Sequence, residues 1–245
     1  MKIKASVVAA AIEGFAPTNI QESWDNSGFT IGGPEKEVSS VLLALDCTPS
    51  VLDEAIERGA DMIVTHHPLI FSPLKRIIGD TVVERMVEQA IKNDIVIYSA
   101  HTNADKVLPG VSGLMAKRLD LKDVEILDAE DENIGLGVLG SLPEKMLASD
   151  LLDYIKRRFD LKVIKHSKPI HGEIERVALC GVSGGSLTHK ALSAGAQALI
   201  TGDLSYHRFL CENGFMVMDI GHFESENEVL ILLKDILSTN ISNFE

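Results

Sequence analysis

The stretch "SVLLALDCTPSVLDEAIERGADMIVTHH" (Ser40–His67) determines the fold class that we expect. It begins with an apolar run typical of a buried strand, continues with a helix that Thr48 caps and Gly59 closes, and ends in a second apolar run. Because these strands are apolar throughout rather than alternating, helices should cover both of their faces. The order of strand, helix and strand therefore predicts an α/β fold with mostly parallel sheets.

The flanking residues continue the same order. Residues 79–94 have helical periodicity, and residues 95–101 form another β-rich apolar run. The N-terminal residues 1–17 contain two lysines and a short apolar run that Glu13 interrupts, which favours an amphipathic helix over a signal peptide. No run approaches the ~20 apolar residues that cross a membrane, so we expect no membrane partner.

The second half of the chain repeats this pattern. The stretch Arg176–Asp203 aligns with Ser40–His67 without a gap, and both contain Gly-Ala before the second strand. Each half also ends a later strand with a histidine that is followed four residues on by an acid, in His101–Asp105 and in His222–Glu226. These shared features are polar and lie at strand ends, where apolar composition does not explain them. They predict an internal duplication.

The duplication predicts two similar α/β domains, residues 1–127 and residues 128–245. The segment that starts the second domain, residues 128–147, is acidic and contains glycines, which suits a domain boundary and a short hairpin. We expect a metal site in the cleft between the two domains.

The composition is that of a globular protein and argues against some partners. The chain has 245 residues, of which 45% are hydrophobic and 24% charged, and its formal net charge is -13. Nucleic-acid binding depends on clustered Lys and Arg, so we expect no broad surface for it. The three cysteines (Cys47, Cys180, Cys211) lie far apart, which predicts neither a disulfide framework nor a cysteine metal site. A reducing cytoplasm fits best.

Candidate metal ligands follow the strands, where parallel sheets place their functional groups. They are His66, His67, His101, Asp105, His222 and Glu226. Adjacent histidines on an extended segment point to opposite sides, so His66 and His67 suit two nearby ions better than one. Two such ions can share a water that becomes a nucleophile near neutral pH. The mixed nitrogen and oxygen ligands favour zinc, manganese, iron or cobalt over calcium. For His101, orienting Asp105 or a substrate is an alternative to ligation.

Five segments, in order, resemble the signature motifs of the Nif-three-like family, often called GTP cyclohydrolase 1 type 2 homologues. They are "WDNSGFTIG" (Trp24–Gly32), "THHPLIF" (Thr65–Phe71), "HTNAD" (His101–Asp105), "ITGDLSYH" (Ile200–His207) and "GHFESE" (Gly221–Glu226). The resemblance covers nearly the whole chain, which has the length of the family's short form. It implies a dinuclear metal site and a ring-shaped homohexamer. The metal ligands that it implies are His66, His67, Asp105, His222 and Glu226, with Glu226 contacting both ions.

Two neighbouring motifs would complete the site. Asp25 and Asn26 suit an Asx-type turn, and the resemblance places their loop at the cleft, where it would contact substrate or the ligands; a simple turn is the alternative. Asp203 could accept a hydrogen bond from a ligand, and His207 could act as an acid or a base; a helix N-cap at Asp203 is the alternative.

The loop Gly181–Ser186 matches G-x-S-x-G between a strand and a helix. A serine nucleophile, a phosphate-binding nest and a structural turn are all compatible with this pattern.

Two classes of function are compatible with these residues. The first is a metal-dependent hydrolase that acts on a nucleotide or phosphoester, with His101 or His207 transferring a proton; the family name points to GTP. The second is a non-enzymatic protein that stores or delivers metal or acts as an adaptor. In either case we expect a cytoplasmic homo-oligomer, and in the first a small-molecule substrate.

Overall fold

The computed structural model describes residues 2–211 and 214–241. The chain consists of two compact units: Met1–Ala104 with Val229–Glu245 form unit 1, and Asp105–Glu228 form unit 2. The domain boundary between residues 127 and 128 was predicted from the repeated sequence pattern, and it stays a prediction.

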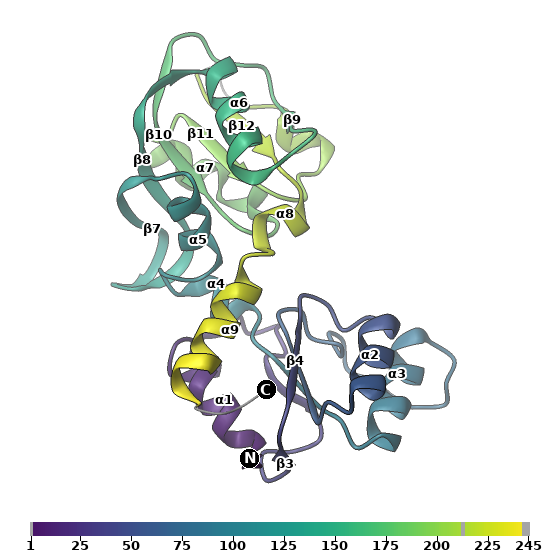
Figure 1. Ribbon diagram of the computed structural model, residues 1–245. Helices are drawn as coiled ribbons and strands as arrows, with labels where there is room; N and C mark the ends of the chain where they lie inside the picture. Colours follow the sequence, from purple (N-terminus) through teal and green to yellow (C-terminus); the bar gives the residue numbers. More distant parts are fainter. Residues whose placement is uncertain (1, 212–213, 242–245) are drawn as a thin grey trace. The chain divides into compact units, whose positions relative to one another are not determined.

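Unit 1 is an α/β layer structure (Figure 1). Its elements are β1 (Ile3–Lys4), α1 (Ala5–Glu13), η1 (Thr18–Ile20), β2 (Gly28–Ile31), β3 (Glu37–Val38), β4 (Val41–Ala44), α2 (Pro49–Arg58), β5 (Met62–Thr65), α3 (Val82–Lys92), β6 (Val96–Ser99), the start of α4 (Thr102–Lys106) and α9 (Val229–Asn240). A four-stranded sheet has the order β2-β6-β5-β4, while β1 and β3 form a separate pair. Helices α1 and α9 lie together on one side of this sheet, and α2 and α3 on the other (Figure 1).

The helix predicted after Thr48 is confirmed as α2. The Thr48 hydroxyl accepts a hydrogen bond from the amide of Val51, and Pro49 occupies the first turn, where its missing N–H costs nothing. Gly59 ends the helix with a φ of 66°, in the left-handed region that glycine adopts without strain. Every residue of β5 and β6 is buried, as their continuous apolar sequence predicts.

Unit 2 contains a larger sheet. Its elements are the end of α4, α5 (Val111–Arg118), β7 (Lys122–Asp131), β8 (Ile134–Leu147), α6 (Ala148–Phe159), β9 (Lys165–His166), β10 (Glu173–Leu179), η2 (Gly184–Leu187), α7 (Thr188–Ser193), β11 (Ala198–Thr201), η3 (Tyr206–Phe209), β12 (Met216–Asp219) and α8 (His222–Glu226). The strand order is β7-β8-β10-β11-β12-β9.

The two faces of this sheet carry separate cores. Along β10, Val177 and Leu179 pack into a core with α5 and α6, whereas Ala178 between them packs into a second core with α7. The same alternation recurs in β12, where Val217 faces the second core. Side chains of a strand point alternately to its two faces, and here both faces are covered by helices.

Both sheets contain parallel and antiparallel strands. Three neighbouring strands of each are parallel, as expected: β4, β5 and β6 in unit 1, and β10, β11 and β12 in unit 2. In unit 2 the antiparallel pairings outnumber the parallel ones, so this sheet is not mostly parallel. Antiparallel strands complete both sheets. A short hairpin was expected in residues 128–147, and this segment forms part of a longer hairpin of β7 and β8. Two residues connect the strands, which is enough to join an antiparallel pair.

The two units share local geometry at the residues that suggested a repeat. Gly59 and Gly195 both have positive φ, 66° and 82°, in the turn between a helix and a central strand. The amides of Ala60 and Ala196 close these helices with the same hydrogen bond, each to the carbonyl five residues earlier. Common ancestry of the halves stays a prediction. Over the described residues, no helix combines the length and the apolar character needed to cross a bilayer.

Candidate metal centre

Three imidazoles gather at the carboxyl edge of the parallel strands in unit 1. His66 and His67 follow β5, and His101 follows the neighbouring strand β6. The ring centroids of His66 and His67 lie 4.9 Å apart, and each lies 5.4 Å from that of His101. The strand-end positions predicted these neighbours, because parallel strands present their carboxyl ends at one edge.

The expectation that His66 and His67 point to opposite sides is wrong. Strand β5 ends at Thr65, whose hydroxyl donates to the carbonyl of His67 over 2.7 Å and so turns the chain. The alternation of a strand therefore does not extend to the histidines. The two rings lie side by side, and their adjacency alone no longer requires two ions.

The backbone fixes the tautomer of His66. Its Nδ1 lies 2.7 Å from the carbonyl oxygen of Ala100, within the buried edge of the sheet. A carbonyl only accepts, so Nδ1 carries the proton and donates. The lone pair of the neutral ring is then on Nε2, which is the form that binds a metal ion.

Carboxylates orient the other two imidazoles in the same way. Nδ1 of His67 donates to Asp46 over 2.8 Å, and Nδ1 of His101 donates to Asp25 over 2.7 Å. Metal-binding histidines commonly donate their second N–H to a carboxylate or a carbonyl. Asp46 was not among the residues predicted from the sequence, although its position directly after the apolar run of β4 matches the strand-end rule that predicted the histidines.

Asp25 is the most strongly held carboxylate of this group. It accepts hydrogen bonds from the His101 ring, the Thr102 amide and hydroxyl, the Asn26 amide and the Ser27 hydroxyl. Burial by itself would raise the pKa of Asp25, but the bonds from His101 and Thr102 outweigh it and hold the pKa well below its usual range. The Asp25 carboxylate is therefore ionised and is held in a fixed position next to the His101 ring.

Unit 2 presents a histidine and an acid on one helix turn. His222 and Glu226 are the first and last residues of α8, and Nε2 of His222 lies 3.0 Å from Oε2 of Glu226. Nδ1 of His222 donates to Asp203 over 2.7 Å. The bond to Glu226 is the main cause that raises the pKa of His222 to about 9; burial opposes it, and Asp203 adds to it. An i, i+4 pair on one helix face is also a common source of two metal ligands.

The chemistry of these donors fits a transition-metal ion. His66, His67 and Glu226 form a group that could hold a metal ion. Asp105, the remaining predicted ligand, is a buried carboxylate in α4. Imidazole nitrogens combined with carboxylate oxygens suit zinc, manganese, iron or cobalt.

Two of the residues predicted to contact the substrate or the ligands form hydrogen bonds within the protein. The side-chain amide of Asn26 donates to the carbonyl of Ile70 over 2.6 Å, which joins the Asn26 loop to the segment after His67. Asp203 orients His222, as described above. His207 lies exposed in η3, where it lines a pocket of about 180 Å³ with His189 and Arg208.

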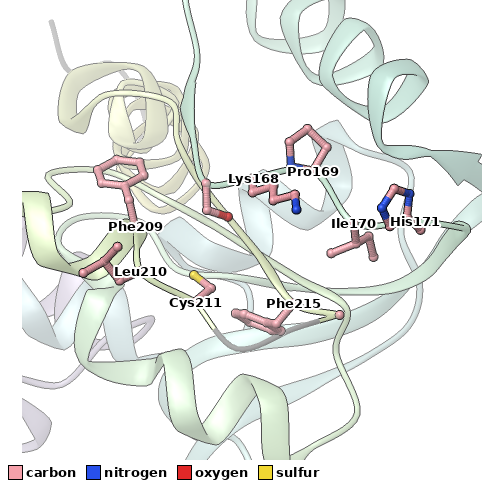
Figure 2. A pocket seen from close by; sticks show the side chains of 10 residues that line it. Lys168, Pro169, Ile170, His171, Phe209, Leu210, Cys211 and Phe215 are labelled. Atoms are coloured by element: carbon pink, nitrogen blue, oxygen red, sulfur yellow. The ribbon is translucent and has the colours of Figure 1, made fainter.

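A larger pocket of unit 2 is distinct from the predicted site residues. Its volume is about 450 Å³, and among the described residues none of the predicted ligands or catalytic groups lines it. Figure 2 shows the side chains around it, from the segment before β10 and the segment before β12: Lys168, Pro169, Ile170, His171, Phe209, Leu210, Cys211 and Phe215.

The loop Gly181–Ser186 is a structural turn. Three of its amides donate to hydroxyl groups of unit 2, over 2.8 to 3.3 Å: Gly181 to Ser112, Val182 to Ser225 and Gly184 to Thr201. Amides in use are not available to cradle a phosphate. A nucleophile elbow strains its serine, whereas here Val182 has the positive φ of 69° and Ser183 a φ of -86°.

Comparison with known proteins identifies the family. The family model described as Duf34/NIF3 (NGG1p interacting factor 3) matches residues 3–245. The chain belongs to the Duf34/NIF3 family. The resemblance of the five sequence motifs is thereby confirmed.

Relatives within the Duf34/NIF3 family match over nearly their full length. A Clostridium perfringens protein named GTP cyclohydrolase 1 type 2 homolog is 37% identical, and the match covers 95% of this chain and 90% of the relative. NIF3-like protein 1 of Drosophila melanogaster is 33% identical, covering 98% and 83%. The crystal structure of a Bacillus cereus protein related to NIF3 shares the fold with a TM-score of 0.89 at 24% identity, covering 99% and 95%. Reduced HcgD from Methanocaldococcus jannaschii has a TM-score of 0.85 at 28% identity, covering 100% and 97%.

Proposed function

We propose that this protein is a metal-dependent hydrolase that holds two divalent ions and acts on a nucleotide or another phosphoester-type substrate. One observation carries the proposal: four imidazoles at strand ends, those of His66, His67, His101 and His222, each have Nδ1 held by a carbonyl or a carboxylate. This common orientation makes Nε2 the atom through which each ring would bind a metal ion or exchange a proton.

The proposed ligands are His66, His67, Asp105, His222 and Glu226. Three imidazoles and two carboxylates offer more donor atoms than the four that a single tetrahedral ion takes, which favours two ions. The two oxygens of Glu226 allow it to contact both. When bound, such ions polarise an electrophile and activate water near neutral pH.

His101 is the proposed proton carrier. Asp25 holds its Nδ1–H, keeps the ring in one orientation and stabilises the ring when it is protonated. Nε2 of His101 can then accept a proton from an attacking water or return it to a leaving group. His207 is the second proposed acid or base, and its exposure in η3 leaves it accessible to a substrate.

A second candidate function is supported by the contacts of Asp203 and Asn26. We infer that these residues hold His222 and the Ile70 segment rather than a substrate, since their side chains are already bonded there. A protein that stores or delivers metal, or that serves as an adaptor, needs ligands held in this way and no proton carrier. The Asp25–His101 pair, by contrast, has the arrangement of a general base and favours the hydrolase.

The remaining expectations accompany this proposal. They are a metal centre in a cleft, duplication of the two halves, a homohexamer and a cytoplasmic location. The relatives named GTP cyclohydrolase 1 type 2 homolog make GTP the first substrate to test. Metal ligands define a reaction class more closely than a substrate, so simple phosphodiesters belong in the same assay.

The test is elemental analysis of the chain purified without chelators, with parallel assays on GTP and a chromogenic phosphodiester. We expect about two ions per chain. His67→Ala and Glu226→Gln should each lose at least one ion, whereas Glu224→Gln, on the same helix, should retain both. Unchanged metal content in His67→Ala and Glu226→Gln would refute the ligand assignment. Two ions without turnover would favour metal storage or an adaptor role.

A further inference from the structure

An exposed aromatic pair stands beside the imidazoles of unit 1. Trp24 is 58% exposed and Phe71 is 52% exposed. Their ring centroids lie 5.8 Å apart, with an angle of 57° between the ring planes. Single exposed apolar side chains are ordinary, but two large rings in contact on a surface form a feature that a ligand can cover.

Both rings lie against His101. The centroid of Trp24 is 6.2 Å from that of His101, and the centroid of Phe71 is 6.3 Å from it, both in edge-on arrangements. His101 in turn contacts the rings of His66 and His67. A ligand resting on the aromatic pair would therefore lie next to the proposed proton carrier.

Hydrogen bonds fix the loops that carry the pair. Asp25, the residue after Trp24, is anchored by His101 and Thr102. The Asn26 side chain bonds to the carbonyl of Ile70, which immediately precedes Phe71. The backbone segments that carry the two rings are thus anchored before any ligand binds, which lowers the conformational entropy that binding has to remove.

We propose that Trp24, backed by Phe71, is the stacking platform for a planar heteroaromatic ring of the substrate, an inference that rests on the proposed function. A ring inserted between two others needs roughly 7 Å between them, twice the ~3.5 Å of a carbon contact. The observed 5.8 Å and the tilt exclude such a sandwich. The ligand ring stacks on the outer face of Trp24, and a nucleobase has the chemistry for this contact.

Trp24 also supplies the measurement, because it is the single tryptophan of the chain. Its fluorescence is titrated with guanosine 5′-monophosphate, with ribose 5-phosphate, which lacks the base, and with tetramethylammonium, which tests a cation–π site instead. The metal content of the same sample is measured in parallel. We expect quenching by the nucleotide at concentrations at least tenfold lower than by either of the other two compounds.

Variants separate stacking from other contributions. Phe71→Leu keeps the reporter and should weaken nucleotide binding several-fold, and Trp24→Leu, measured by calorimetry, should weaken it roughly tenfold or more. Ile91→Ala, a matched change of an exposed apolar residue in unit 1, should bind as the unaltered protein does. All three variants should retain their metal.

Several results would overturn this inference. They are equal quenching by nucleotide and ribose 5-phosphate, preferential quenching by tetramethylammonium, and unweakened binding by Trp24→Leu. Loss of metal in Trp24→Leu would also overturn it, by showing that the ring supports the centre rather than a ligand. Failure of the proposed function would be seen in a different experiment. If His67→Ala and Glu226→Gln retain their ions, the ligand assignment is refuted, whereas the fluorescence titration of Trp24 is unaffected.

Discussion

Replacing Asp25 with alanine should strongly destabilise unit 1. Three of the donors to this carboxylate are themselves buried: Nδ1 of His101 and the amide and hydroxyl of Thr102. A buried donor that loses its acceptor costs about 1–3 kcal/mol. Three such donors, with partial compensation by water entering the space, give a loss of about 3–4 kcal/mol in the free energy of unfolding.

The assay is urea unfolding followed by the fluorescence of Trp24. This ring precedes Asp25 directly and is the only tryptophan of the chain, so its signal follows unit 1. With a slope of about 2 kcal/mol per molar urea, the midpoint should fall by roughly 1.5–2 M. The control is Asp53→Ala, which removes an exposed carboxylate of α2 and should change stability by less than about 0.5 kcal/mol. A loss below about 1 kcal/mol in Asp25→Ala would refute the claim that these hydrogen bonds hold the loop.

Three further predictions concern pH, turns and packing. The pKa of Asp25 is lower in the folded chain than in the unfolded chain, so its contribution is fully present above about pH 4 and is lost progressively as the pH falls below that value. The difference in urea midpoint between the unaltered protein and Asp25→Asn should therefore shrink as the pH is lowered below about 4. Gly59→Ala should cost about 1–2 kcal/mol in thermal unfolding, because no atom lies within 4 Å of the added methyl group and only the left-handed backbone opposes it. Ile155→Ala should cost about 2–5 kcal/mol, measured by circular dichroism because this core side chain lies in unit 2. A Gly59→Ala variant as destabilised as Ile155→Ala would contradict the stated cause.

Local sequence signals predicted the elements that local interactions determine. The helix α2 follows from Thr48 and Pro49 at one end and Gly59 at the other, all within one short stretch. The positions of the candidate ligands followed from a rule about strand ends, which needs only the order of strands in a parallel sheet. The strands β2 and β9 were missed because their pairing depends on distant partners, and apolar periodicity does not distinguish a parallel from an antiparallel neighbour.

The contact between Asp25 and His101 could not be predicted from local sequence signals. These residues are far apart in sequence, and they meet because β2 pairs with β6 in an antiparallel register that sets Gly28 opposite Ser99. A shift by one residue would have turned the β2 side chains to the other face. The sequence motif around Asp25 therefore indicated a functional loop, whereas its role as the partner of His101 required the register.

The two adjacent histidines differ in how securely they are oriented. His66 is held by the carbonyl of Ala100, a main-chain group that any residue at that position supplies. His67 is held by the side chain of Asp46, which lies at the end of a different strand and is more than half exposed. The parallel pairing of β4 and β5 brings Asp46 beside His67. The hydrogen bond to Nδ1 of His66 thus comes from the main chain of the neighbouring strand segment, while the hydrogen bond to Nδ1 of His67 comes from a side chain that a substitution can remove.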